Sequence, residues 1–110
     1  MKTSELSGAA LDWAVATAEG EDYFKLDLYA PSKLWEQGGL IIEQEKIGIW
    51  WATHFVDDEG VEYGNHWYAE DKDGYVQTGQ TPLTAAMRCY VASKLGDEVQ
   101  IPDELTMLGG

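Results

Sequence analysis

Residues 81–96 constrain the fold more than any other stretch, because they contain the start, the body and the end of one helix. Thr81 is suited to cap the N-terminus, and Pro82 fits the first helical position, where its missing N–H is not needed. Gly96 supplies a C-terminal stop. Only four polar or charged residues interrupt the apolar body: Thr84, Arg88, Ser93 and Lys94. A helix that is apolar on most sides is buried, so the sequence predicts a central helix that the rest of the chain covers.

The first half of the chain contains a second strong helical pattern. Residues 6–19 place apolar side chains at helical spacing, with Ser7 as the expected N-cap and Gly20 as the end. Residues 23–30 alternate apolar and charged side chains, which is compatible with a strand or with an ordered extended loop. Residues 32–37 predict a short helix, which the glycines at 38 and 39 should break or kink before one further turn at 40–43.

The strands are expected in the second half of the chain. Residues 47–53 are dense in β-branched and aromatic side chains and form the clearest strand. Shorter strands are predicted around 67–69, at 75–77 and at 98–101. Because helices and strands are segregated, the predicted class is α+β, a small mostly antiparallel sheet of three to four strands packed with two main helices. Residues 1–110 should form a single domain, with 103–110 as a flexible tail.

Net charge restricts the partners. The chain has 20 acidic and 7 basic residues, for a formal net charge of −13 at pH 7. Such a field repels the backbone of nucleic acids, so we expect no direct nucleic-acid binding and an attraction to basic proteins instead. No window approaches the ~18 apolar residues of a membrane span, and the N-terminus lacks an apolar signal region. We therefore expect a cytoplasmic protein that has no membrane partner.

Three blocks of sequence carry a family resemblance. They are LSG at 6–8 with ALDWAVA at 10–16; Trp35 with Gly38-Gly39 and IIE at 41–43; and GQTPL at 79–83 continuing through Ala86-Met87-Arg88, Val91 and Gly96. In these blocks the chain resembles the NinX-type small proteins of tailed bacteriophages and prophages, a family of unknown biochemical function. A weaker similarity extends to phage domains described as helix–sheet–helix sandwiches. The resemblance implies a sheet flanked by helices and a phage product made in a bacterial cytoplasm, and it transfers no catalytic residue.

No enzymatic motif is found in the sequence. There is no nucleophile elbow, phosphate-binding loop or paired-cysteine zinc motif. His54, His66 and Cys89 do not have the spacing of a zinc site, and buried Cys89 is read as a small apolar residue. Residues 71–74 resemble the opening of a calcium loop but lack its later acidic ligands, so they predict a turn. We expect no catalytic residue, no metal and no cofactor.

The candidate partner-binding site is acidic. Seven acidic residues fall within 17 positions and are opposed only by Lys72: Asp57, Asp58, Glu59, Glu62, Glu70, Asp71 and Asp73. They occupy two turns that follow each other along the chain, and we expect them to face one direction. A carboxylate array of this kind can imitate DNA phosphates and so block a DNA-binding protein. A solvated loop region that only aids solubility is the alternative interpretation.

Arg88 and the tryptophans form a second candidate site. Arg88 is the one charged residue in the middle of the central helix, so it should either pair with Asp12 or Glu43, or bind an anion in a pocket. Trp50 and its neighbour Trp51 should point to opposite faces of a strand. If one face of the sheet is open, Trp50 or Trp67 becomes an exposed aromatic suited to binding, and Trp35 is a third candidate. Otherwise these tryptophans belong to the core.

The function predicted from the sequence is that of a non-enzymatic phage accessory protein that binds and modulates a host protein. The specific form of this prediction is an acidic anti-defence or DNA-mimic inhibitor of a basic or DNA-binding host protein. The alternative is a small-ligand or nucleotide-binding protein that sequesters its ligand with Arg88 and the aromatic side chains of Trp35, Trp50 and Trp67. Nothing in the sequence indicates the oligomeric state.

Overall fold

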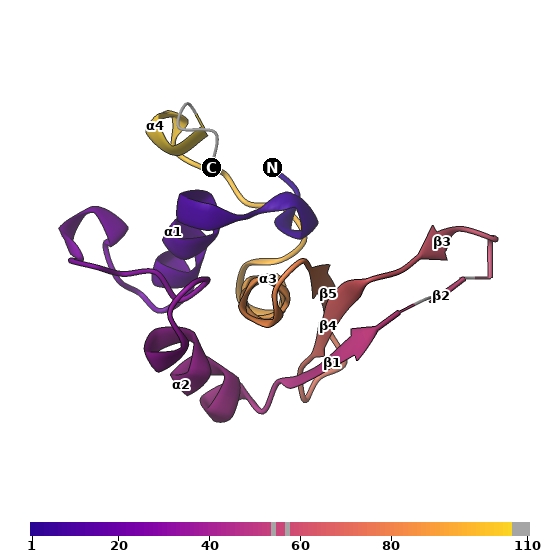
Figure 1. The fold of residues 1–110 in the computed structure, drawn as a ribbon. Helices are drawn as coiled ribbons and strands as arrows, with labels where there is room; N and C mark the ends of the chain where they lie inside the picture. The colour runs from indigo at the N-terminus through magenta and orange to yellow at the C-terminus, as the bar shows by residue number, and fades with distance from the viewer. Residues whose placement is uncertain (54, 57, 107–110) are drawn as a thin grey trace.

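The predicted central helix is present in the computed structural model, which describes residues 1–53, 55–56 and 58–106. Helix α3 (Pro82–Leu95) lies in the middle of the molecule (Figure 1). The Thr81 side chain accepts a hydrogen bond from the Thr84 N–H at 3.1 Å, and Gly96 ends the helix with a φ of 94°. Eight residues of α3 are buried: Leu83, Ala85, Ala86, Met87, Cys89, Tyr90, Val91 and Ala92.

Three antiparallel strands form the larger sheet. They are β1 (Gly48–Ala52), β4 (His66–Glu70) and β5 (Val76–Gly79), in the spatial order β1-β4-β5. Between β1 and β4 the chain forms a separate two-stranded sheet of β2 (Phe55–Val56) and β3 (Glu62–Tyr63). This hairpin continues the β1–β4 pair outward as an arm that projects from the body (Figure 1). The predicted α+β class with a small antiparallel sheet is confirmed.

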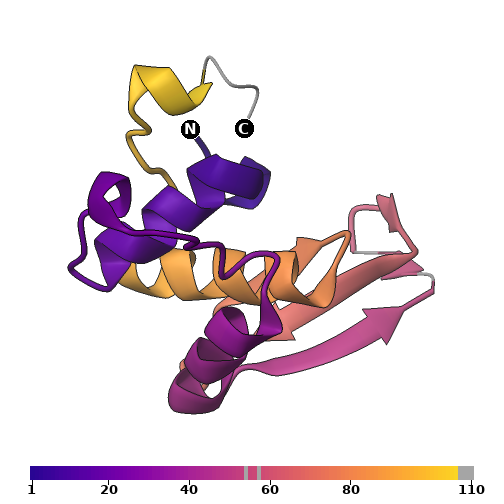
Figure 2. The same cartoon turned by 60° about the vertical axis from the view of Figure 1, so that its left-hand side comes forward.

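The helices lie on one side of the larger sheet. Helix α3 packs on the sheet, while α1 (Gly8–Ala18) and α2 (Trp35–Glu45) pack on other sides of α3 (Figures 1 and 2). Gly79 makes the close approach of β5 and α3 possible, since a Cβ atom there would lie 2.6 Å from the Ala85 nitrogen. The opposite face of the sheet carries no helix among the described residues.

The predicted break in α2 is wrong. The helix runs from Trp35 to Glu45 without interruption through Gly38 and Gly39. A Cβ atom at Gly38 would overlap the Pro31 carbonyl and lie 2.7 Å from Leu83 Cδ2, so only glycine lets α2 pack this closely. Two helical glycines cost about 1 kcal/mol each relative to alanine, and tertiary packing outweighs that propensity here.

Two other segments differ from the strands that alternation suggested. Of the two readings of residues 23–30, the ordered loop is correct, and it begins with the short 3-10 helix η2 (Tyr23–Lys25), capped by Asp22. The strand predicted at 98–101 is reduced to one bridge between Lys2 and Glu98. Val99 is buried beside the N-terminus, where the Met1 ammonium donates to the Val99 carbonyl at 2.9 Å.

The segment 103–110, expected to be a flexible tail, begins with a short helix. Residues Asp103–Thr106 form the short helix α4, and Leu105 is buried. Helix α4 contacts α1. The remaining tail positions, 107–110, lie outside the described residues. No helix in the described part of the chain has both the length and the apolar character needed to cross a membrane.

Asp12 is a buried carboxylate that joins α1 to the loop before α2. Its Oδ1 atom accepts a hydrogen bond from the Ser32 N–H at 2.9 Å. Burial raises the pKa of Asp12, and the hydrogen bond from the Ser32 N–H and the charge of Lys33 oppose that rise. The ionised form of Asp12 is therefore less favourable in the folded chain than in the unfolded chain.

We predict that Asp12→Asn increases the free energy of unfolding at neutral pH. The asparagine oxygen still accepts from Ser32, but no buried charge remains. Because the folded-state pKa of Asp12 is raised, the native protein binds more protons than the unfolded protein at pH values between the unfolded-state pKa and the folded-state pKa. Its stability therefore falls as pH rises through the folded-state pKa. The gain from Asp12→Asn should vanish near pH ~4.

Urea unfolding of the wild type and Asp12→Asn at neutral pH and at pH ~4 measures this gain. The variant Asp27→Asn, at an exposed position, is the control. An equal pH-dependent gain for Asp27→Asn would contradict the burial argument.

Candidate functional site

The structure separates the predicted acidic residues into two clusters. Asp58 and Glu59 are exposed in the turn between β2 and β3, while Glu70 and Asp73 are exposed around the turn between β4 and β5. In the β1–β4 pair, Gly48 lies opposite Glu70 and Ala52 lies opposite His66, so these turns are at opposite ends of β4. At about 3.3 Å per residue, β4 alone holds them roughly 13 Å apart. The expected single array facing one direction is therefore not formed by the described residues.

The other three predicted acidic residues have different roles or placements. Asp71 is buried, and its Oδ1 accepts hydrogen bonds from the Asp73 N–H at 2.9 Å and the Tyr75 N–H at 3.0 Å. It thus builds the turn before β5 and offers little to a partner, as aspartates in such turns commonly do. Glu62 belongs to β3, on the arm. Asp57 lies outside the described residues.

One face of the larger sheet is open, and Trp50 lies on it. Ile49 and Ala69, which are paired across β1 and β4, pack into the core, so their neighbours Trp50 and Tyr68 point to the opposite face. The rings of Trp50 and Tyr68 stack with centroids 5.6 Å apart and planes 15° apart, and Trp50 remains 43% exposed. We call the surface formed by Trp50, Tyr68, Glu70 and Val76 the open sheet face.

The other tryptophans are distributed over different surfaces. Trp67 lies on the core side of the sheet, edge-to-face with Trp51 at 5.4 Å, and packs against the core. Trp35 is 54% exposed at the start of α2. The condition posed from the sequence, that an open sheet face would expose a tryptophan, is therefore met by Trp50 and not by Trp67.

Arg88 does not form the predicted ion pair. Its Nε donates to the Leu6 carbonyl at 2.7 Å, and its Nη1 donates to the Thr78 carbonyl at 2.7 Å. Among the described residues, the Asp12 carboxylate is bonded to Ser32 instead, and Glu43 is exposed on α2. The reason is geometric: Arg88 lies where the end of the N-terminal 3-10 helix η1 (Thr3–Glu5) and strand β5 both present a backbone carbonyl to α3.

Arg88 also borders a polar pocket of about 400 Å³. Among the described residues, these line it: Ser7, His66, Thr78, Gly79, Gln80, Thr81, Thr84 and Arg88. None of them is a carboxylate, and none is a tryptophan. Trp35 instead lines a separate pocket of about 290 Å³ with Lys33 and Pro82, and the two pockets share Thr81. The structure thus brings Arg88 together with hydroxyl groups and not with the predicted aromatic side chains.

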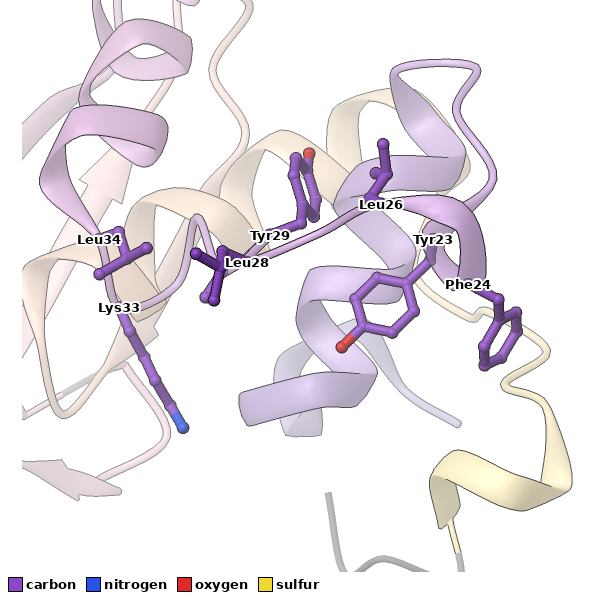
Figure 3. A pocket seen from close by; sticks show the side chains of 8 residues that line it. Tyr23, Phe24, Leu26, Leu28, Tyr29, Lys33 and Leu34 are labelled. Carbon is purple, nitrogen blue, oxygen red and sulfur yellow. The ribbon is translucent and has the colours of Figure 1, made fainter.

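Sequence reasoning missed an apolar pocket in the loop after η2. It has a volume of about 470 Å³ and is lined by Tyr23, Phe24, Leu26, Leu28, Tyr29, Ala30, Lys33 and Leu34 (Figure 3). Leu28 is 82% exposed and has a φ of 51°, a left-handed conformation that costs a leucine about 1–2 kcal/mol. The alternation of Phe24, Leu26 and Leu28 was the only sequence signal, and it equally suited a strand.

The side chain of Gln37 holds this loop in place. Its Oε1 accepts from the Ala30 N–H at 2.6 Å, and its Nε2 donates to the Leu28 carbonyl at 2.7 Å. Both backbone groups are therefore satisfied by one residue of α2, on either side of Tyr29. This clamp stabilises the conformation in which Leu28 is presented to solvent.

No metal site is evident in the part of the chain that the structure describes: no three His, Cys, Asp or Glu side chains there are grouped to hold an ion. His54, one of the three residues considered from the sequence, lies outside the described residues. Cys89 is buried in α3, and burial raises the pKa of its thiol to about 12. A thiol in that state is a poor nucleophile and a poor metal ligand.

Comparison with known families decides the relationship. The family described as Bacteriophage P22, NinX matches residues 23–94, which is more than half of the chain. The chain belongs to the NinX family. It is therefore a protein of bacteriophage or prophage origin. The match to NinX covers the Gln37-clamped loop, the sheet and nearly all of α3, and it begins after α1. No curated protein matches the chain.

We predict that Leu28→Gly stabilises this NinX-family chain by about 1 kcal/mol, because glycine adopts a positive φ without the steric cost that leucine bears. Leu26→Gly is the matched control, since Leu26 has a φ of −88° and gains nothing from glycine. Urea unfolding midpoints measure both changes. A loss of stability for Leu28→Gly equal to that of Leu26→Gly would show that Leu28 is not strained.

Proposed function

We propose that this phage protein is a non-enzymatic accessory protein that binds and modulates a basic host protein through the open sheet face. The observation that supports this most directly is the stacked Trp50–Tyr68 pair on a sheet face that no described helix covers. Aromatic side chains that are ordered before binding lose little entropy when a partner buries them, and they dominate the energy of many interfaces.

The open sheet face has the composition of an interface centre. Trp50 lies opposite Tyr68 across β1 and β4, and the exposed Val76 lies opposite Glu70 across β4 and β5. A partner that covers Trp50 removes its exposed area from water, at about 25 cal/mol per Å² of apolar surface. The exposed Glu70 on the same face adds a carboxylate at the edge of this apolar centre.

The two acidic clusters determine the sign of the charge that a partner must carry. Asp58 and Glu59 lie beyond one end of the β1–β4 pair, and Glu70 and Asp73 lie at the other. A partner that spans the open sheet face therefore meets carboxylates on both sides of an aromatic centre, within a chain of net charge −13. Complementary basic residues would accelerate association and favour the correct orientation.

The specific form of the proposal is an anti-defence inhibitor that occupies the DNA-binding surface of a host protein. Two separated clusters suit a partner whose lysines and arginines lie at both edges of a groove, rather than along one continuous row. The proposal involves no reaction, no cofactor and no direct contact with nucleic acid or membrane. It places the protein in the bacterial cytoplasm, where such a partner is found.

We predict that Trp50→Ala abolishes retention of the partner from bacterial lysate, while Trp35→Ala does not. Both tryptophans are exposed, but only Trp50 lies on the open sheet face. Mass spectrometry identifies what the wild-type protein retains, and titration of the purified partner should show an affinity loss of at least about tenfold for Trp50→Ala. Equal binding by the two variants would refute this surface.

A charge exchange tests the acidic component separately. The double variant Glu70→Lys/Asp73→Lys should weaken binding, and the remaining affinity should depend less on salt concentration. The matched control is Glu36→Lys/Glu43→Lys, which changes the net charge equally on the exposed side of α2. If both pairs weaken binding to the same extent, only the overall charge acts, and the two clusters are not the site.

A further inference from the structure

We infer that the polar pocket beside Arg88 is a binding site for a phosphate group, either free or carried by a nucleotide. The pocket is lined by Arg88, His66, Gln80, Ser7, Thr81 and Thr84, among others. Its volume of about 400 Å³ is within the ~300–1,000 Å³ of small-molecule sites. This inference is independent of the proposed protein binding, because phosphate can be titrated without any partner.

The guanidinium of Arg88 is held in place and has donors to spare. Two of its N–H groups bind the carbonyls of Leu6 and Thr78, each at 2.7 Å. A guanidinium carries five N–H donors, so three have no acceptor among the described residues. Because the two carbonyls fix the plane of the group, its remaining donors form a fork of the kind that matches two oxygens of a phosphate.

The hydroxyl groups at the start of α3 are arranged to donate as well. The Thr81 oxygen accepts from the Thr84 N–H at 3.1 Å, and its own proton is directed to the Thr84 oxygen at 3.0 Å. The Thr84 hydroxyl thus already has a donor for its oxygen, and its own proton is left for another acceptor. That acceptor can be an oxygen of a bound anion in the pocket that Thr84 lines.

Two helix N-termini add positive potential at the same place. Ser7 precedes α1 and Thr81 precedes α3, and both line the pocket. The partial positive charges of two helix ends therefore meet beside a cationic Arg88. None of the described residues that line this pocket is a carboxylate, in a protein with 20 acidic residues, so the site differs from the surface around it.

His66 supplies an independent indication of a missing ligand. Its Nδ1 atom is buried and has no hydrogen-bond partner in the part of the chain that the structure describes. Buried polar atoms are nearly always paired, because an unpaired one costs the free energy of its lost hydration. An oxyanion in the pocket that His66 lines would provide an acceptor for an Nδ1 proton.

NMR titration with inorganic phosphate tests the site. We expect the amide signals of residues 79–85 to shift in the wild-type protein, and sodium chloride at equal ionic strength to leave them in place. Thr84→Val removes the donating hydroxyl but keeps the Thr81 cap and the side-chain volume, and should weaken binding by about tenfold. Thr17→Val, at an exposed position of α1, is the matched control and should bind like the wild type.

The variant Arg88→Lys tests whether the remaining N–H donors of the guanidinium bind two oxygens of the phosphate. It keeps the charge but loses the two-oxygen geometry, so we expect at least the same weakening, with the amide spectrum reporting whether the fold is intact. If Arg88→Lys does not fold, the phosphate affinity of Thr84→Val decides whether the pocket is the binding site. No shift beyond that of sodium chloride, or equal binding by Thr84→Val and Thr17→Val, overturns the inference. Adenosine monophosphate, titrated in parallel, identifies the source: tighter binding than phosphate indicates a nucleotide, and equal binding indicates the phosphate group alone.

Discussion

The burial of α3 on nearly all sides is the constraint on which the rest of the structure depends. An apolar helix of this length cannot satisfy its surface with one neighbour, so it contacts the strands of the larger sheet, α1, α2 and the N-terminal η1. Three of these neighbours approach closely because small residues permit it. Gly79 admits β5, Gly38 admits α2, and the alanines of α1 lie within the same core. The layers of the molecule are therefore a consequence of covering one helix.

The polar contacts of α3 join segments that are distant in sequence. Arg88 bonds Leu6 and Thr78, and the Tyr90 hydroxyl donates to Glu19 at the end of α1 at 2.6 Å. Lys94 pairs with Glu45 at 3.2 Å, at the end of α2. These bonds lie at the boundary of the core, where the desolvation cost is lower than at its centre. They orient the neighbours that hydrophobic burial has brought together.

The same architecture places the candidate binding surfaces at different positions on the molecule. Since the helices of the described residues lie on one side of the sheet, the other side is left with exposed Trp50 and the acidic ends of its strands. The phosphate pocket forms instead where β5 meets the starts of α1 and α3. The loop presented by Gln37 is a third surface, on which Leu28 is exposed at a steric cost. Membership of the NinX family relates this arrangement to phage biology without specifying which surface acts.

The sequence by itself determined the elements whose signals are local. The capped and stopped helix at 81–96, the apolar period of residues 6–19 and the aromatic strand at 47–53 were all predictable, because cap chemistry and side-chain periodicity act within a few residues. Only the tertiary structure decided the rest. The glycines of α2 are helical because Pro31 and Leu83 lie against them; the acidic turns separate because β4 runs between them; and Arg88 binds carbonyls from residues 6 and 78. Each of these outcomes depends on groups that meet only when the chain has folded, and no local pattern records such distances.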